Sequence, residues 1–306
     1  MATAAAALVG AESILALTPV AIKKTPLDHI SAIWSRTLSS SFLGFSLAAD
    51  RTLHAGEWAG ALALGNANLL HIASSYESFR NLPAGQAMSL LYTYPLWNLV
   101  FGSLFGGERI STRDYGCMSI AMIGSLLLNT DPGPAAHGST IRNPNTTWGI
   151  AMGIVMALTE SAMHTILKAL NWRDPAKSVW IVNSSASAWL AAALGVQQLW
   201  NGGYHGPVSG GGTWWDAALL TAFHSISMFS GYWLRFYAVP RLSVVTYSIL
   251  SYAGLLASYL FGLLFLGERP GWISLIGALL ILVSGILLQA APGEKTEEES
   301  DDEKAA

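Results

Sequence analysis

The stretch FGSLFGGER, residues 101–109, has a near copy in FGLLFLGER, residues 261–269. Each copy ends a long apolar run, and each is followed after a short polar turn by another apolar run. The same Gly-Glu-Arg group at two such positions indicates an internal repeat built around pairs of apolar helices. In each copy the glycine permits a tight turn at a helix end.

The composition is that of a membrane protein. Hydrophobic residues make up 52% of the chain and charged residues only 11%, whereas soluble domains carry about 25% charged residues. The net charge of −3 comes largely from the acidic segment GEKTEEESDDEKAA after Pro292, which we expect to be disordered. Cys117 is the only cysteine, which excludes an internal disulfide and a metal site built from cysteines.

Ten apolar stretches are long enough to cross a membrane as helices, because unpaired backbone groups are not tolerated in lipid. The predicted spans are 4–22, 30–49, 57–79, 84–105, 113–130, 147–169, 178–199, 214–237, 243–265 and 271–290. The sequence therefore predicts an all-α integral membrane protein with ten transmembrane helices.

The repeat extends beyond the Gly-Glu-Arg group. A shift of 160 residues aligns Tyr92 with Tyr252, and nearby shifts align Glu12 with Glu160 and His71 with His224. We expect a first five-helix repeat at 1–130, a connecting loop at 131–146, a second repeat at 147–291 and an acidic tail at 292–306. Because five is odd, the second repeat enters the membrane from the opposite side, so we expect the two repeats to be inverted relative to each other, as in many secondary transporters.

The distribution of basic residues favours cytoplasmic N- and C-termini, by a mild bias. In this orientation the cytoplasmic loops and helix ends hold Arg51, Arg109, Arg113, Lys168, Arg173, Lys177, Arg235 and Arg241. The opposite side holds Lys23, Lys24, Arg80, Arg142 and Arg269.

The two stretches LWNLVFGSLFGGERISTRDYGCMSIAMIGSLLL and LLASYLFGLLFLGERPGWISLIGALLILVSGILL resemble the EamA-like branch of the drug/metabolite transporter superfamily. The resemblance covers most of residues 5–290. It implies ten helices in two inverted repeats around a central substrate cavity, and transport of a small metabolite without ATP hydrolysis. The resemblance does not indicate which solute is moved.

Two glutamates lie inside predicted spans. Glu12 is near the middle of the first span and Glu160 is at a comparable depth in the sixth. A charged side chain at mid-bilayer costs about 2.5–3.5 kcal/mol on insertion scales, so both must face protein or water. They are candidates for binding a proton or a cation, and a structural hydrogen bond to a neighbouring helix is the alternative.

Two histidines repeat in the same way. His71 is followed three residues later by Ser74, and His224 by Ser227, which places each pair on one helix face. A histidine that titrates near neutral pH could relay protons. Neutral, hydrogen-bonded packing is the alternative for both histidines.

Aromatic and polar residues cluster around Pro95 in the fourth span and at the matching place in the ninth. A proline removes a backbone donor and can free a carbonyl, and an aromatic wall suits a flat or partly apolar solute. Packing in the core or at the lipid interface is the alternative. These candidates for substrate contact are Tyr92, Tyr94, Trp97, Asn98 and Tyr252.

Other charged residues have structural or gating interpretations. Glu77 and Arg80 are close enough to pair at the end of the third span. In the two Gly-Glu-Arg copies, the glutamate can lie favourably near the next helix N-terminus, and the arginine can reach lipid headgroups. These four residues are Glu108, Arg109, Glu268 and Arg269.

These observations favour a secondary transporter of a small organic solute that works by alternating access. Proton coupling and solute exchange both stay open as energy sources, because no GxxxxGK[ST] nucleotide motif occurs. The alternatives are a scaffold or receptor without transport and an intramembrane enzyme, for which no nucleophile–base or metal spacing is present. We expect a lipid bilayer and a small solute as partners, no nucleic acid, no cofactor and no metal, and leave open whether the protein is a monomer or a homodimer.

Overall fold

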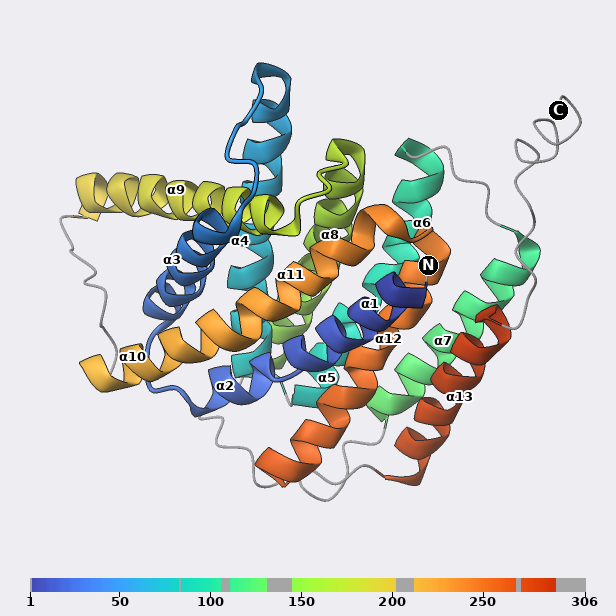
Figure 1. The fold of residues 1–306 in the computed structure, drawn as a ribbon. Helices are drawn as coiled ribbons and strands as arrows, with labels where there is room; N and C mark the ends of the chain where they lie inside the picture. Colours follow the sequence, from blue (N-terminus) through green and yellow to red (C-terminus); the bar gives the residue numbers. More distant parts are fainter. Residues whose placement is uncertain are drawn as a thin grey trace, which may run out of the picture.

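The computed structural model describes residues 2–82, 84–105, 111–130, 145–201, 212–267 and 271–289. These residues form helices joined by short turns, with no β-strand among them (Figure 1). The first half contains α1 (Ala2–Leu15), α2 (Thr18–Lys24), α3 (His29–Leu47), η1 (Ala55–Glu57), α4 (Trp58–Asn81), α5 (Ala84–Leu91), α6 (Tyr94–Phe105) and α7 (Thr112–Thr130). The second half contains α8 (Thr146–Leu170), α9 (Pro175–Asn201), α10 (Trp214–Phe223), η3 (His224–Met228), α11 (Phe229–Ala238), η4 (Val239–Arg241), α12 (Val244–Phe261), η5 (Gly262–Leu266) and α13 (Trp272–Gln289).

A helix or a succession of helices occupies each of the ten predicted stretches. Among the described residues, four segments are long and apolar enough to cross a membrane: Ala2–Lys24, Thr146–Leu170, Pro175–Val196 and Val244–Leu266. The chain is thus all-helical in the described part and contains membrane-length apolar helices. The number of ten crossings stays a prediction.

The surface agrees with a lipid environment. Large apolar side chains point outward from several helices, for example Phe42 on α3 (70% exposed), Ile226 in η3 (72%) and Trp272 on α13 (82%). Soluble monomers rarely expose such extensive apolar surface. These side chains therefore face the acyl chains of a bilayer.

Two of the predicted spans are broken rather than continuous. The first span turns at Ala16 and Leu17 between α1 and α2, just before Pro19. The fourth turns at Tyr92 and Thr93 between α5 and α6, just before Pro95. A proline cannot donate the backbone hydrogen bond that a continuous helix requires, and it disfavours helical geometry in the residue before it.

The eighth and ninth predicted spans contain irregular turns instead of breaks. A π-helical turn, η3, separates α10 from α11 and contains His224. A second π-helical turn, η5, ends the α12 segment at Gly267, whose φ of 71° is left-handed. This glycine belongs to the second Gly-Glu-Arg copy, so its predicted role in a helix-ending turn is confirmed.

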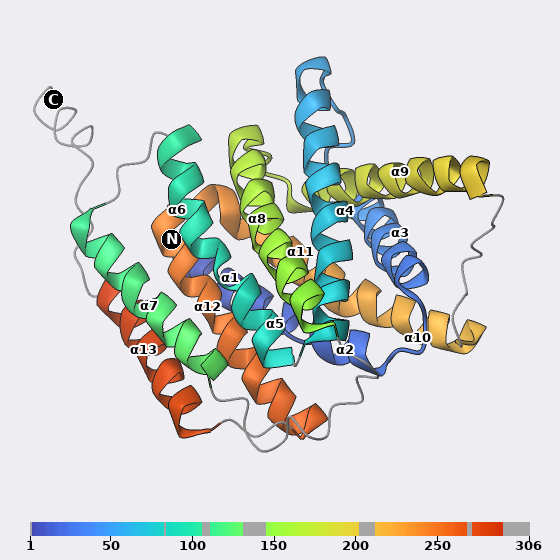
Figure 2. The same ribbon diagram turned by 180° about the vertical axis from the view of Figure 1, so that it is seen from behind.

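Helices from the two halves pack in antiparallel pairs. Near the start of α7, the Cys117 carbonyl accepts a hydrogen bond from Ser284 Oγ at 2.6 Å, near the end of α13. In the same way Asn98 Nδ2 of α6 donates to Ser248 Oγ of α12 at 3.3 Å. Figures 1 and 2 show α7 and α13 side by side along one edge of the molecule. Antiparallel pairing of corresponding helices is what inverted repeats require.

The pattern of helix contacts is itself symmetric between the halves. Helix α1 packs on α11 as α8 packs on α4, and α1 packs on α12 as α8 packs on α5 and α6. The pairs α3 with α9, α6 with α12 and α7 with α13 connect each helix to its own counterpart. Exchanging the two halves therefore reproduces the same set of neighbours.

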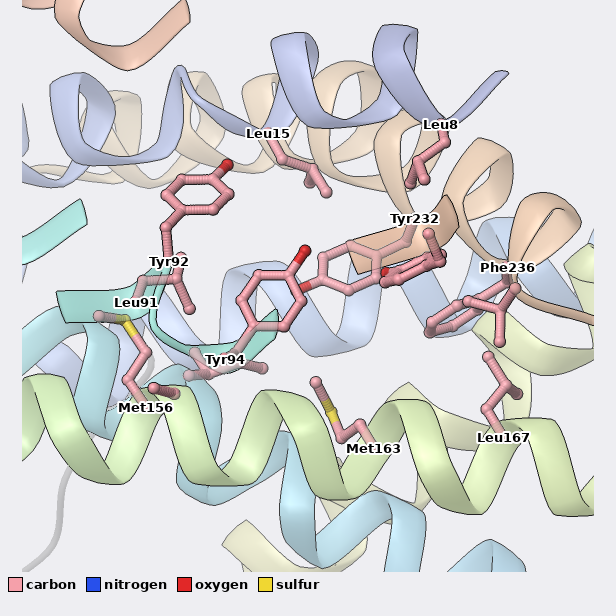
Figure 3. Packing of buried hydrophobic residues seen from close by; sticks show 14 of the residues in the cluster. Leu8, Leu15, Leu91, Tyr92, Tyr94, Met156, Met163, Leu167, Tyr232 and Phe236 are labelled. Carbon is pink, nitrogen blue, oxygen red and sulfur yellow. The ribbon is translucent and has the colours of Figure 1, made fainter. Parts of the chain in front are cut away.

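A layer of aromatic side chains lies where α1 and α8 face each other. Figure 3 shows Leu8 and Leu15 of α1 on one side and Met156, Met163 and Leu167 of α8 on the other. The space between them is filled by Tyr92, Tyr94, Tyr232 and Phe236. The candidate site lies within this layer.

Candidate functional site

Three oppositely charged side chains form a network in this interior. Arg235 of α11 lies between Glu12 of α1 and Glu160 of α8, and all three side chains are at least 94% buried. Buried charges are stable only when they are paired and hydrogen-bonded. Because Glu12 belongs to the first half and the other two residues to the second, the network joins the halves.

The geometry of the network is asymmetric. Arg235 Nε donates to Glu12 Oε1 at 2.9 Å, and Nη2 donates to Oε1 and Oε2 at 2.7 and 2.8 Å. Arg235 Nη1 donates to Glu160 Oε1. Glu160 Oε2 has no hydrogen-bond partner within the described residues. Glu12 is therefore held rigidly, whereas Glu160 keeps one free acceptor.

The two helix breaks bring further groups to Glu12. Tyr92, at the turn between α5 and α6, donates its hydroxyl to Glu12 Oε2 at 3.1 Å. Gly254 of α12 permits this approach, since a Cβ there would lie 1.9 Å from the Tyr92 hydroxyl and 3.0 Å from the Glu12 carbonyl. The break before Pro95 thus places a predicted candidate, Tyr92, against a predicted carboxylate.

His71 lies next to the free oxygen of Glu160. Its Nδ1 is 3.2 Å from the Met156 carbonyl and 3.4 Å from Glu160 Oε2. While Nδ1 donates to the carbonyl, it does not donate to the carboxylate, which explains why Glu160 Oε2 has no partner.

His224 has a different environment from His71, although the two occupy corresponding positions in the repeat. Its Nδ1 is 3.0 Å from Ser35 Oγ, and its Nε2 is 3.4 Å from the Tyr76 hydroxyl. The side chain is fully buried in the π-helical turn η3, and Ser35 also contacts Thr221. His224 is therefore linked to hydroxyl groups and not to the carboxylates.

A cavity of about 40 Å³ opens beside the network. Its polar lining consists of Thr18, Arg36, His71, Ser75, Tyr92, Tyr232 and Arg235. Its apolar lining consists of Leu15, Phe79, Met88, Leu91 and Met156. A water needs roughly 10–15 Å³ of such space, so the cavity has room for a few waters.

Arg36 of α3 provides a second buried guanidinium, 3% exposed. Its Nη2 donates to the Tyr232 hydroxyl at 2.5 Å, and its Cζ lies 5.0 Å from the centre of the Tyr232 ring. The Cζ of Arg235 lies 5.6 Å from the same ring. Tyr232 therefore contacts both arginines of the cavity.

Several predicted candidates lie away from the cavity lining. Ser74 donates to the Leu70 carbonyl of its own helix at 2.7 Å instead of contacting the His71 ring, and Ser227 is half-buried in η3. Tyr94 and Tyr252 are buried with unbonded hydroxyls. Asn98 is buried against Ser248, and Trp97 is half-buried.

Glu77 and Arg80 take separate partners in the structure. Glu77 lies 2.6 Å from His29 Nδ1 and accepts from Trp148 Nε1 at 2.8 Å. Arg80 donates to the Leu27 carbonyl at 2.6 Å. These contacts join the end of α4 to the α2–α3 connection and to the start of α8.

The charged residues of the two Gly-Glu-Arg copies lie outside the described residues. They are Glu108, Arg109, Glu268 and Arg269.

A separate polar cluster joins loops of the two halves. Lys177 of α9 contacts Asp50, in the connection after α3, at 2.6 Å. The hydrogen bonds from Lys177 and Thr52 hold the pKa of Asp50 well below its usual range. Asp174 accepts from the backbone N–H of Ala49 at 2.9 Å. This cluster fastens the α3–η1 connection to the start of α9.

Sequence reasoning misses three buried groups of this interior. Arg235, which the sequence places at a helix end, does lie in the last turn of α11, but its side chain is buried in the Glu12–Glu160 network. Arg36 carries a signal that sequence could have used, a basic residue inside a predicted span. His164, one turn after Glu160, is buried against Tyr247 with neither ring nitrogen bonded.

The described residues contain no group of three or more His, Cys, Asp or Glu side chains that could hold a metal ion. The site itself offers paired charges, hydroxyl groups and guanidinium groups beside the cavity. The fold and this site define a multi-pass integral membrane protein made of two similar halves around a small polar cavity.

The comparisons with known proteins identify the family. The model of the EamA-like transporter family matches the chain twice, at residues 2–130 and 147–289, so the chain belongs to this family. It is accordingly a membrane protein of the drug/metabolite transporter superfamily. Because this is a family of transporters, membership favours transport over catalysis.

The fold also matches solved structures. One crystal structure of a protein superposes with a TM-score of 0.66 at 16% sequence identity, over 93% of this chain and 94% of the other. At this identity the match concerns the fold alone. No curated protein matches the chain in sequence.

Proposed function

We propose that this chain is a secondary transporter that moves a small organic solute through its central cavity by alternating access. The proposal rests on one observation above all, the buried Glu12–Arg235–Glu160 network, which joins the two halves directly beside the cavity. A charged network across a moving interface can be made and broken without leaving charges unpaired, provided that the solute or a proton replaces a lost partner.

The finer architecture belongs to the same proposal. We place ten membrane crossings in two inverted repeats, 1–130 and 147–291, with the cavity at their interface and both termini in the cytoplasm. The broken first and fourth spans support this placement, because irregular backbone within a membrane protein usually lines a cavity or is covered by protein.

Proton coupling is the energy source that the site supports best. His71 Nδ1 of α4 and Glu160 Oε2 of α8 are 3.4 Å apart, and this oxygen has no hydrogen-bond partner among the described residues. The charged groups nearby are Arg36 of α3 and Arg235 of α11, with Glu12 of α1 behind Arg235. Solute exchange without protons is the second candidate, and it predicts transport that is independent of a pH gradient.

The test is uptake into liposomes that contain the purified protein. The panel comprises labelled amino acids, amines, organic acids, nucleotide sugars and nucleobases, each with and without a pH gradient. We expect uptake of at least one solute without ATP, and loss of the pH-gradient effect in Glu160→Gln and His71→Gln. A folded protein that moves no solute of the panel would contradict transport and favour a scaffold or receptor.

A further inference from the structure

We infer that the cavity recognises the singly charged anionic group of its solute through Arg36, and the apolar body of that solute through the adjacent wall. This inference rests on the proposed transport function and names the chemical class of the solute, an organic monocarboxylate. It follows from the sign of the charges on the cavity wall, from the hydrogen bonds that the two arginines already make, and from the apolar part of the lining.

The charged groups that face the cavity are all basic or neutral. Arg36, Arg235 and His71 are the titratable nitrogen groups of its wall. No carboxylate is among the cavity's lining residues in the described part of the chain, and Glu12 and Glu160 are each paired with Arg235. A solute that enters this space therefore meets guanidinium groups, hydroxyl groups and apolar surface, which suits an anion and repels an ammonium group.

The two arginines differ in how far their donors are used. Arg235 makes four hydrogen bonds to carboxylates, three to Glu12 and one to Glu160. Arg36 forms no ion pair with a carboxylate of the described residues; its Nη2 donates to the hydroxyl of Tyr232, and the Tyr76 hydroxyl is its other hydrogen-bonding neighbour. A guanidinium has five donors in a planar fork that matches a carboxylate. Arg36 is therefore the available anion-binding group.

The number of charges limits the solute to one negative charge. With both glutamates ionised, Glu12, Glu160, Arg235 and Arg36 sum to zero, so a bound anion adds one uncompensated charge. A proton on His71 or on Glu160 Oε2, which lie 3.4 Å apart, restores the balance. A dianion would need a second proton or cation in the same buried space, which is strongly unfavourable.

The rest of the wall fits a hydrocarbon body. Phe79, Met88, Leu91 and Met156 line the cavity beside the polar groups. Methionine side chains adapt to ligands of different shape, because they are unbranched and polarisable. A compact carboxylate with an apolar body can thus place its charge at Arg36 and its hydrocarbon against these side chains.

The experiment measures binding by the purified protein and transport in liposomes. The probes share an apolar body and differ in charge: benzoate, benzamide and benzylamine, with phenyl phosphate as a dianion and 3-methylbutyrate as an aliphatic carboxylate. We expect benzoate or 3-methylbutyrate to bind at least about tenfold more tightly than benzamide, a difference of about 1.4 kcal/mol. Benzylamine and phenyl phosphate should bind more weakly than benzoate.

The variants locate the effect at Arg36. Arg36→Gln should lower benzoate affinity about tenfold or more and leave benzamide affinity unchanged. Arg36→Lys should keep part of the preference for benzoate over benzamide. The matched control is Arg51→Gln, because Arg51 is exposed after α3 and stacks on Phe45 outside the cavity. If Arg36→Gln does not fold, the charge series on the unmodified protein and on Arg36→Lys still decides the question.

The outcomes separate this inference from the proposed function. No carboxylate binding, equal binding of benzamide or benzylamine, or unchanged benzoate binding by folded Arg36→Gln would each overturn the inference. If the protein carries neutral or cationic solutes but no carboxylate, transport stands and the inference is wrong. If it binds carboxylates at Arg36 but carries nothing, the inference stands and the transport function is wrong.

Discussion

Arg235 holds Glu12 through three hydrogen bonds of 2.7 to 2.9 Å, which link α11 of the second half to α1 of the first. The same arginine also binds Glu160 of α8, the position that corresponds to Glu12 in the repeat. One arginine thus pairs with both members of a symmetric pair of carboxylates, and the arginine itself has no symmetric counterpart in the network.

The network predicts an order of stabilities. Arg235→Gln leaves two buried carboxylates without a counter-charge, and removal of one partner from a buried ion pair costs about 3–5 kcal/mol. Glu160→Gln should cost less, because Arg235 keeps its bonds to Glu12. Thermal unfolding in detergent measures the stability of both variants. The triple variant Arg235→Gln, Glu160→Gln and Glu12→Gln should be more stable than Arg235→Gln alone, because it leaves no buried charge of the network unpaired. An Arg235→Gln protein as stable as its parent would contradict the network.

The hydroxyl of Tyr92 should contribute to the stability of the fold, whereas the hydroxyl of Tyr252 should not. Tyr92→Phe removes a hydrogen bond to Glu12, and bonds to charged groups are worth about 1.5–3 kcal/mol. Tyr252 is the matched control, since its ring is 6.2 Å from that of Tyr92 and its buried hydroxyl has no partner. Tyr252→Phe should be neutral or slightly stabilising in the same unfolding assay. Equal losses in both variants would contradict the assigned hydrogen bond.

Close packing between the halves predicts that Gly44 cannot be enlarged. A Cβ at Gly44 of α3 would lie 2.6 Å from the backbone nitrogen of Trp180 in α9. Gly44→Ala should therefore destabilise the protein by about 1–3 kcal/mol, as overpacking does. Gly195 of the same helix α9 is the control, because nothing lies within 4 Å of its Cβ position. Gly195→Ala should stabilise by about 0.5–1 kcal/mol, since alanine favours helix. Melting temperatures that fall equally in both variants would argue against the close contact between α3 and α9 at Gly44.

The Asp50–Lys177 contact predicts a dependence of stability on pH. The pKa of Asp50 is lowered in the folded protein, chiefly by the hydrogen bond from Lys177. A carboxyl with a depressed folded pKa adds stability above its unfolded pKa of about 3.9 and loses that contribution as pH falls further. In a double-mutant cycle with Asp50→Asn and Lys177→Gln, the coupling should be largest above about pH 5 and shrink below about pH 4. A coupling that is constant from pH 7 to pH 3 would exclude this ion pair.

The sequence predicts the fold better than the site. The apolar runs predict the all-helical membrane architecture, and the duplicated Gly-Glu-Arg group predicts the repeat. Both signals are local in the sequence and need no knowledge of tertiary contacts. Glu12 and Glu160 can be found because a carboxylate in an apolar run is costly unless it is paired. The alignment of Tyr92 with Tyr252 also corresponds to proximity in space, since the centres of the two rings lie 6.2 Å apart.

The partners of these residues depend on tertiary structure and cannot be read from spacing. Arg235 is near the end of its predicted span, where an arginine usually reaches the lipid headgroups, and only the packing of α11 on α1 shows that it faces inward. Likewise His71 and His224 correspond in the repeat, but one lies beside a carboxylate and the other among hydroxyl groups. The repeat predicts equivalent positions and not equivalent surroundings.

Alternating access requires that the cavity open in turn to the two sides of the membrane. Ser75 lines the cavity and is 3% exposed, so Ser75→Cys in a Cys117→Ala background reports access to it. A membrane-impermeant thiol reagent should label this variant from either face of sealed vesicles, whereas Thr52→Cys, in the exposed connection after α3, should be labelled from one face only. Labelling of Ser75→Cys from one face alone, or from neither face of a folded protein, would contradict alternating access.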